Sequence, residues 1–399
     1  MVASTVVLSL VVWVLRRPDQ LLRPYVWVEE YLIINRTITE GFWSAAVGEY
    51  VGYLMVPTSL IVAAVTVIDL RSLPELAYLA ATIVFILTIL LIVVPSSRVP
   101  LRARCLLALL LALAPMNPEM FGIALYSYWW TALWPAITLL WDRNAWALRL
   151  PVLVLGGLSG LAGAALVVPH ALASLMRRRT SDRVSTAVLG GLFVLQGAIY
   201  AGSARRSTIP VQPLSIARQF VRNFGSYAFG WVQGATPEFI EFAGLVVAVF
   251  IGAAVVRQLL QRSACGEELV LFAASLGVLG LLSSSAAPLI THQVLAGPRY
   301  YFYPFVLTAW SLLLVAAGAD HLAVRRTAFS LLVASALTLA PAFSRTHVPR
   351  SWDDELRRCA QSDDDVVSIP VHFDGTETMW DDAVRLPSSR CRELVASTD

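Results

Sequence analysis

Apolar residues in this chain gather into eleven long runs that are separated by short polar or charged segments. Runs of this length with few charges are typical of membrane-spanning helices, because a helix satisfies its own backbone hydrogen bonds in lipid. The pattern predicts an all-α, polytopic transmembrane helix bundle of about 10–11 helices. The runs cover residues 2–15, 50–68, 76–94, 103–115, 128–141, 150–175, 184–201, 241–257, 268–290, 302–319 and 327–343.

The polar end of the chain differs from the rest and predicts a separate segment. Residues 1–344 form the transmembrane part, and residues 345–399 hold three acidic clusters and one strand-like run at 366–371. We expect this small polar tail to pack against outer loops or to be partly disordered, since it has few large apolar groups. Cys359 and Cys391 both lie in it and could form a disulfide in an oxidising compartment, but the sequence leaves their pairing open.

Arginine clusters orient the predicted bundle, because cytoplasmic loops of membrane proteins carry an excess of basic residues. The clusters at 177–183, 257–262 and 325–326 lie on alternate loops. The loops at about 16–49 and 202–240, the segment 291–303 and the tail are then extracytoplasmic.

One region opposes this alternation. It would put Asn117-Pro118-Glu119 inside and Arg98 outside. A half-spanning segment within residues 95–120 would remove the conflict.

Composition excludes several classes of protein. Charged residues make up 14% of the chain and hydrophobic residues 57%. All 30 basic residues are arginines, so there is no lysine for a P-loop, a Schiff base or a protein-kinase site. A net charge of +3 is too small for a nucleic-acid-binding surface. No histidine or cysteine pair has metal-ligand spacing, so we expect no metal or other cofactor, and nothing indicates a divalent cation.

The first outer loop carries the strongest candidate chemistry. Adjacent carboxylates, Glu29 and Glu30, lie at a membrane boundary, where ionisable groups are costly and are therefore often functional. Such a carboxylate could act as general base towards a sugar hydroxyl. Glu49, Tyr50 and Tyr53 lie at the start of the second apolar run and could contact the sugar. The alternative is a rim of membrane-interface anchors.

Two later stretches could complete a substrate site. Glu119 is a carboxylate near membrane depth, and Trp129 lies in an aromatic stretch that could stack on a sugar or pack as an interface belt. His292 precedes the turn at Gly297-Pro298, where Arg299 and Tyr300 lie at headgroup height. Arg299 could hold a lipid phosphate there, or could be a snorkelling arginine at a helix end.

Three short motifs give the chain a resemblance to a known superfamily. Trp27-Val28-Glu29-Glu30, Tyr50-Val51-Gly52-Tyr53 and Gly297-Pro298-Arg299-Tyr300 resemble motifs of the GT-C polytopic glycosyltransferases, which use polyprenyl-phosphate sugars. The closer likeness is to a poorly characterised bacterial GT-C-like group. In that group an acidic pair follows the first helix and Tyr-x-Gly-Tyr opens the second.

The resemblance implies a fold, an activity and a location. It implies a GT-C-like bundle in the bacterial plasma membrane with an extracytoplasmic site. The site would transfer a sugar, with inversion, from a polyprenyl-phosphate donor to a cell-envelope glycan or lipid acceptor. The catalytic carboxylate maps onto Glu29 or Glu30, and a second acidic site maps onto Glu119. The adjacent glutamates and the missing large C-terminal domain depart from the family pattern and leave the base unassigned.

Other functions fit the same sequence. A flippase or transporter of lipid-linked glycans would carry charges inside its helices. A polysaccharide polymerase would use arginine-rich outer loops, such as 202–240 with Arg205, Arg206, Arg218 and Arg222. A structural membrane protein would need no acidic pair. The glycine-rich run 156–163 predicts close helix packing and not a phosphate loop.

Overall fold

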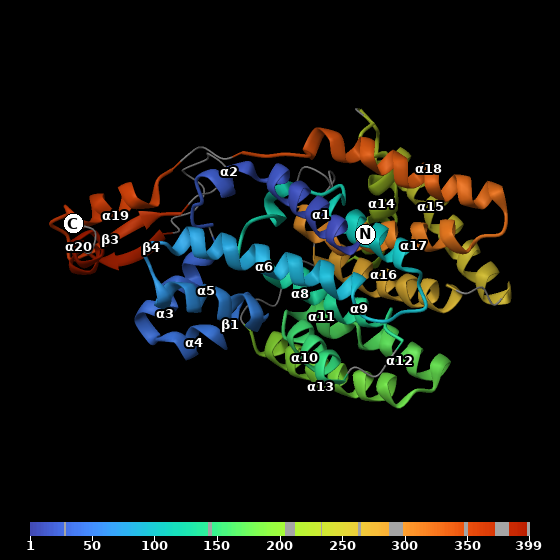
Figure 1. The fold of residues 1–399 in the computed structure, drawn as a ribbon, viewed down its shortest axis with the longest axis horizontal. Helices are drawn as coiled ribbons and strands as arrows, with labels where there is room; N and C mark the ends of the chain where they lie inside the picture. The colour runs from blue at the N-terminus through green and yellow to red at the C-terminus, as the bar shows by residue number, and fades with distance from the viewer. Residues whose placement is uncertain are drawn as a thin grey trace.

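The computed structural model is an elongated helical molecule, with its apolar helices at one end and a small mixed unit at the other (Figure 1). The C-terminal elements and helices α3, α4 and α5 lie together at the left of that view. The structure describes residues 1–27, 29–142, 146–203, 212–232, 234–261, 265–286, 298–346, 350–371 and 383–396.

The first half of the chain alternates long and short helices. It contains α1 (Val2–Arg16), α2 (Pro18–Leu22), α3 (Glu30–Glu40), α4 (Phe42–Ala46), the hairpin strands β1 (Glu49–Tyr50) and β2 (Tyr53–Leu54), α5 (Val56–Ile68), α6 (Leu73–Val93), α7 (Leu101–Ala112), the 3-10 turn η1 (Pro118–Met120), α8 (Ser127–Ala132), α9 (Trp134–Thr138), α10 (Trp146–Gly157), α11 (Leu161–Ala165) and α12 (Val167–Arg177).

The second half continues with longer helices and ends in the mixed unit. It contains α13 (Thr180–Gly202), α14 (Pro213–Phe229), α15 (Pro237–Gln261), α16 (Gly266–Ala286), η2 (Pro298–Tyr301), α17 (Phe302–Gly318), α18 (Leu322–Leu339), η3 (Ala340–Ala342), α19 (Trp352–Ala360), β3 (Val366–Pro370), β4 (Ala383–Pro387) and α20 (Ser388–Ala396).

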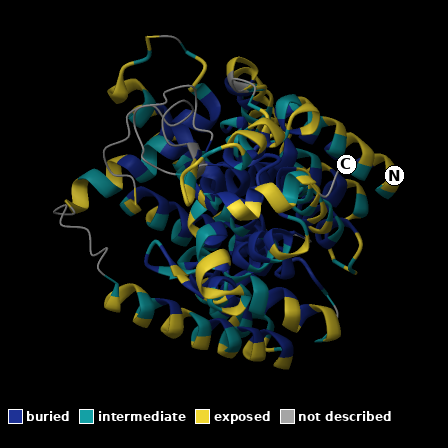
Figure 2. Ribbon diagram, turned by 90° about the vertical axis from the view of Figure 1, so that its left-hand side faces the viewer, coloured by how far each residue is buried: buried dark blue, intermediate teal, exposed yellow. Residues whose placement is uncertain are grey.

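The apolar runs do form helices, as the sequence predicts. Within the described ranges, five helices are long and apolar enough to cross a membrane: α6, α13, α15, α16 and α18. Further apolar helices are shorter than 18 residues. Outer faces carry exposed apolar side chains such as Val194, Phe242 and Phe329 (Figure 2). In water these faces would be unfavourable, so they indicate a membrane protein. The full number of spans, 10–11, stays a prediction.

The two ends of helix α6 define the two ends of the bundle. Its 21 residues rise about 31 Å at ~1.5 Å per residue, enough for a hydrocarbon core of ~30 Å. Before α6, Arg71 forms an ion pair with Asp353 of the C-terminal unit. After α6, Arg98 forms ion pairs with Asp142 and Glu267.

Arg98 and the later arginine cluster lie at the same end, contrary to strict alternation. Glu267 also pairs with Arg177, and Asp142 also pairs with Arg179. Each of these two carboxylates therefore links Arg98 to an arginine of the later cluster. We call this the arginine end. Helix α7 is only 12 residues long, and it carries the chain back to η1 and Glu119. The conflict at residues 95–120 is thereby removed.

Buried arginines bind the open carbonyl ends of several helices. The last carbonyl oxygens of a helix have no partner within the helix, and a guanidinium can satisfy two or three of them. Arg104 donates to the carbonyl oxygens of Val93 and Val99 at 2.9 and 3.2 Å, after α6. Arg16 likewise bonds to the carbonyl oxygens of Ala114 and Met116, after α7.

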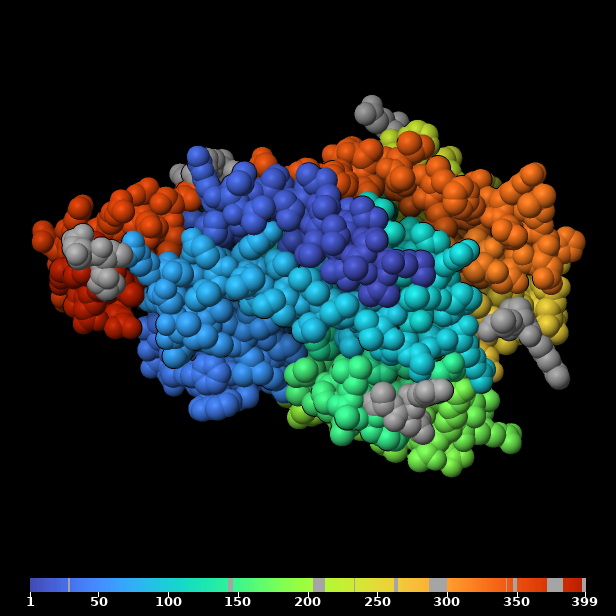
Figure 3. Space-filling view, viewed as in Figure 1, coloured from blue at the N-terminus to red at the C-terminus, as the bar shows by residue number. Residues whose placement is uncertain are grey.

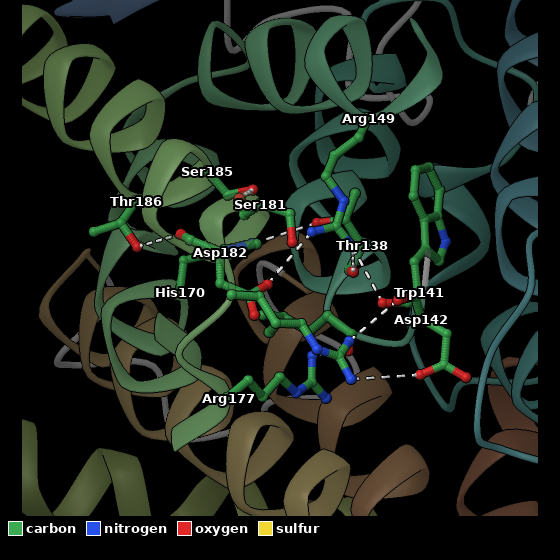
Figure 4. Close-up of polar contacts among 12 residues, drawn as sticks. Thr138, Trp141, Asp142, Arg149, His170, Arg177, Ser181, Asp182, Ser185 and Thr186 are labelled. Atoms are coloured by element: carbon green, nitrogen blue, oxygen red, sulfur yellow. Dashed lines mark hydrogen bonds and ion pairs between the residues drawn. The ribbon is translucent and has the colours of Figure 1, made fainter. Parts of the chain in front are cut away.

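Figure 4 shows the same arrangement after α9. Arg149 donates to the carbonyl oxygens of Thr138 and Trp141 at 3.3 and 3.1 Å and pairs with Asp182 at 3.4 Å. Arg177 donates to the carbonyl oxygen of Leu139 at 2.9 Å. Several arginines that the sequence offered only as topology markers are therefore part of the bundle's packing.

Two predicted runs are divided into shorter helices for local reasons. The run 128–141 is split into α8 and α9 next to Pro135, which cannot donate a helical hydrogen bond. The run 150–175 is divided near Gly160, whose φ is 109°. A Cβ at Gly163 would lie 1.9 Å from the carbonyl oxygen of Gly156. The glycine run therefore packs chain segments closely, as predicted.

Residues 202–240 are not simply an outer loop. They contain helix α14, which packs against α15, α16, α17 and α18. Gln219 and Asn223 on α14 are fully buried, and Arg222 forms an ion pair with Glu241 on α15. These polar side chains lower the mean hydropathy of α14, so the apolar pattern did not reveal it. Arg205 and Arg206 lie outside the described residues.

The C-terminal residues that the structure describes, 350–371 and 383–396, form a unit that packs against the N-terminal segments. Strands β3 and β4 pair antiparallel, and a disulfide joins Cys359 on α19 to Cys391 on α20. The unit lies against the N-terminal segments in the space-filling view (Figure 3). The Tyr25 hydroxyl donates to the Pro370 carbonyl oxygen at 2.7 Å. The strand expected at 366–371 and the open disulfide pairing are both settled.

Candidate functional site

Glu30 is buried and is held by backbone hydrogen bonds. It begins helix α3 and is 4% exposed. Its Oε2 accepts a hydrogen bond from the Trp27 N–H at 2.8 Å, and its Oε1 accepts one from the Leu125 N–H at 3.0 Å. Glu30 therefore ties the first outer loop to the segment that enters helix α8.

Burial makes the Glu30 carboxyl group a weaker acid. The pKa of Glu30 is raised from 4.5 to about 7, mainly by desolvation and in smaller part by the nearby charge of Glu29. The backbone N–H groups of Trp27 and Leu125 act in the opposite direction, because they stabilise the carboxylate. Since both oxygens already accept backbone hydrogen bonds, Glu30 has little capacity left to take a proton from a substrate.

Glu29 and Glu119 meet at the hydroxyl group of Tyr126. The Tyr126 hydroxyl bonds to Glu29 Oε2 at 3.3 Å and also to Glu119 Oε1. The Trp27 indole N–H donates to the same hydroxyl oxygen at 2.9 Å. A phenol carries one proton and donates it to one acceptor at a time, so the Tyr126 hydroxyl can donate to either carboxylate but not to both at once. We call Glu29, Tyr126 and Glu119 the acid cluster.

Local structure explains why these three side chains converge. Glu29 is the N-cap residue of α3, but its carboxylate does not cap the helix. Asn117 caps the turn η1 by accepting from the Glu119 N–H at 2.9 Å, which fixes the backbone at Glu119. Tyr126 is fully buried apart from this contact region, one residue before α8 begins. Three segments thus bring their polar ends to one place.

Aromatic residues form a second group one helical turn along α8. The ring of Trp129 lies 4.9 Å from that of Tyr303 and 6.3 Å from that of Tyr300, measured between centroids. Tyr53 from β2 lies within electrostatic range of Tyr303 and packs on Gly160. The predicted sugar-contact residues Tyr53, Trp129 and Tyr300 are therefore brought together. The Trp129 indole nitrogen is buried and has no hydrogen-bond partner within the described part of the chain.

Two other predicted residues of the first loop lie elsewhere. Glu49 is exposed on strand β1. Tyr50 is buried, its hydroxyl donates to the Ala45 carbonyl oxygen at 3.0 Å, and the Arg36 guanidinium lies 5.7 Å from its ring. Tyr50 thus packs the hairpin against α4.

His292 lies outside the described residues. Arg299 belongs to the turn η2, but the structure does not describe its side chain. Their predicted substrate contacts remain predictions.

The sequence did not single out the centre of the site. Tyr126 was one of several aromatic residues before Trp129, and only the fold shows that its hydroxyl joins two carboxylates. Arg345, at the start of the expected tail, is also missing from the prediction. Its side chain donates to Asn117 Oδ1 at 3.1 Å, beside Glu119. The pairing of a distant arginine with η1 has no sequence signal.

The acid cluster can take up and release a proton beside an aromatic surface. No group of three or more histidine, cysteine, aspartate or glutamate side chains suits a metal ion within the residues that the structure describes. Whether a metal or other cofactor takes part therefore stays a matter of prediction. Carboxylates and a phenol are groups that can serve as general acids and bases.

Comparison with protein-family models, with curated proteins and with solved structures finds no match to this chain.

Proposed function

We propose that this chain is a membrane glycosyltransferase of the GT-C type that transfers a sugar from a polyprenyl-phosphate donor, with inversion. The acceptor is a cell-envelope glycan or lipid. The observation that carries the proposal is the acid cluster, in which Glu29 and Glu119 share the Tyr126 hydroxyl. Inversion needs one base that removes the proton of the acceptor hydroxyl as it attacks the sugar.

Within the acid cluster, Glu29 acts as that base. Its carboxylate is partly exposed, whereas the Glu30 oxygens are occupied by backbone N–H groups. Glu119 accepts from Tyr126 and receives the proton through the phenol. Tyr53, Trp129 and Tyr300 offer flat aromatic surfaces against which a sugar or an isoprenoid can stack. Arg299, in the turn η2 before α17, contacts the donor phosphate.

The site belongs on the outer face of a bacterial plasma membrane, in a multi-pass protein. The arginine end, with Arg98, Arg177 and Arg179, faces the cytoplasm by the positive-inside rule. The acid cluster lies beyond the other end of α6. The disulfide between Cys359 and Cys391 supports an oxidising compartment on that side.

A donor panel tests the activity. The full chain in lipid nanodiscs is given polyprenyl-phosphate sugars, and release of polyprenyl phosphate is measured. Glu29→Gln should lower the rate by at least about 100-fold, the contribution of a general base. Glu40→Gln, an exposed residue on the same helix α3, is the matched control and should leave the rate unchanged. Undiminished transfer by Glu29→Gln would falsify the assignment of the base.

A flippase of lipid-linked glycans is the second candidate. The polar face of α14 favours it, because buried Gln219 and Asn223 and the Arg222–Glu241 pair lie inside the helix bundle. The ion pairs at the arginine end oppose it, since they would have to open for a path to the cytoplasm. Binding of a lipid-linked glycan without release from any donor would favour the flippase.

A further inference from the structure

Two arginines lie beside the acid cluster and have no role in the function proposed above. Arg17 directly follows α1, and Arg345 follows η3. The Arg345 backbone N–H donates to the Arg16 carbonyl oxygen at 3.2 Å, so the two segments run side by side. This backbone contact brings Arg17, near the start of the chain, and Arg345, near its end, to the same part of the molecule.

Arg17 has an unused donor in a buried position. Its side chain is 0% exposed, and its Nε and Nη2 both donate to the Asp19 carboxylate at 3.0 Å. Its Nη1 is buried and has no hydrogen-bond partner among the residues that the structure describes. A buried guanidinium N–H without a partner is unfavourable, because it has given up its hydrogen bonds to water. The guanidinium carbon lies 5.6 Å from the ring of Trp27, which bonds to Tyr126.

Arg345 completes the pair from the other side. Its Nη1 donates to Asn117 Oδ1 at 3.1 Å, a neutral acceptor next to Glu119. Burial lowers the pKa of Arg345, the positive charge of Arg17 lowers it further, and Glu119, Tyr126 and Asp19 raise it. These influences show that Arg345 lies within electrostatic range of both Arg17 and the acid cluster.

We propose that Arg17 and Arg345 bind a phosphate group directly beside the acid cluster. The proposal rests on the glycosyltransferase function and names two further side chains, besides the Arg299 proposed there, that contact the leaving group. Guanidinium groups bind phosphate oxygens through paired, charge-assisted hydrogen bonds. A phosphate would give the Arg17 Nη1 a partner.

The position also suits the balance of the transfer step. The acceptor oxygen forms a bond to the sugar C1 and gives its proton to Glu29. The bond between C1 and the phosphate oxygen breaks, and its electron pair goes to that oxygen. The two arginines stabilise the negative charge that develops there. The carboxylates of the acid cluster exclude the phosphate from their own side and so direct it towards the arginines.

Binding can be measured apart from activity. The full chain in phosphatidylcholine nanodiscs is titrated with farnesyl phosphate, with inorganic phosphate and with farnesol. We expect farnesyl phosphate to bind and farnesol to bind far more weakly. Saturation by inorganic phosphate at similar concentrations would assign the site to free phosphate. Nanodiscs with phosphatidylglycerol test a phospholipid as the ligand. If phosphatidylglycerol competes with farnesyl phosphate, the site is assigned to lipid headgroups.

Charge-removing variants test the two residues. Arg17→Gln and Arg345→Gln should each weaken farnesyl phosphate binding by about 10- to 100-fold, the effect of one charge-assisted hydrogen bond. Arg23→Gln, an exposed arginine on the same loop, is the control and should bind as the wild type does. Glu119→Gln should bind the probe more tightly, because it removes a nearby negative charge. That gain tests the site even where an arginine variant fails to fold.

The outcomes separate this proposal from the glycosyltransferase itself. If the wild type transfers sugar but Arg17→Gln and Arg345→Gln bind farnesyl phosphate as tightly as the wild type, only the phosphate site is overturned. Arginine-dependent phosphate binding by a chain that transfers no sugar supports the site and counts against the enzyme. Equal losses in all three arginine variants would reduce the result to a general surface charge effect and would also overturn the site.

Discussion

The Glu30 carboxylate offers a sharp test of the electrostatics of the site. It is buried between the N–H groups of Trp27 and Leu125. Glu30→Gln keeps the shape of the side chain and removes its charge. Glutamine can accept only one of the two backbone hydrogen bonds, and so can protonated glutamate. The variant therefore imitates the protonated wild type at every pH.

The magnitude follows from the shift in acidity. Burial raises the pKa of Glu30 from 4.5 to about 7, a difference equivalent to about 3 kcal/mol. Because the folded state holds the proton more tightly, this stability is complete below pH 4.5 and is lost as the pH rises through about 7. Relative to Glu30→Gln, the wild type should lose about 3 kcal/mol of unfolding free energy between pH 4.5 and pH 8.

Thermal unfolding followed by tryptophan fluorescence in nanodiscs can measure this difference. Wild type and Glu30→Gln should melt at similar temperatures at pH 5, and the variant should melt higher at pH 8. Glu40→Gln, with its exposed carboxylate, should follow the wild type at both pH values. A gap between wild type and Glu30→Gln that stays constant from pH 5 to pH 8 would refute the reasoning, since the carboxyl would then titrate normally.

Three further variants test the packing. A Cβ at Gly244 would lie 2.0 Å from a carbonyl oxygen of α14, whereas a Cβ at Gly252 on the same helix would meet no described atom within 4 Å. Gly244→Ala should therefore cost about 1–3 kcal/mol of stability and lower the melting temperature. Gly252→Ala should leave the melting temperature unchanged. Arg177→Met leaves the buried Glu268 without its ion pair at 3.0 Å, at a cost of about 3–5 kcal/mol, and adding Glu268→Gln should recover part of the loss in the same melting assay. Cys359→Ser opens a disulfide that spans 32 residues, so limited proteolysis should cut the C-terminal unit faster, consistent with about 3–4 kcal/mol of lost local stability.

The apolar pattern predicted the helical class and most helix positions, because a long apolar run in lipid has no alternative to a helix. It failed where polar residues are buried by neighbouring helices. Helix α14 carries Gln219, Arg222 and Asn223, and only its packing against α15 and α16 makes that composition stable. It also failed at Pro135, where one run becomes two short helices.

Sequence alone identified acidic and aromatic residues at a boundary, since charge and interface aromatics are readable from composition and spacing. It could not tell Glu29 from Glu30, because adjacent side chains point to different surroundings that only the fold supplies. In the structure Glu30 accepts hydrogen bonds from two backbone N–H groups, whereas Glu29 is hydrogen-bonded to the Tyr126 hydroxyl. The approach of Arg345 to Asn117 spans 228 positions of sequence and exists only because α1, η1 and the end of α18 converge. Such long-range contacts depend on helix packing, and no local pattern encodes them.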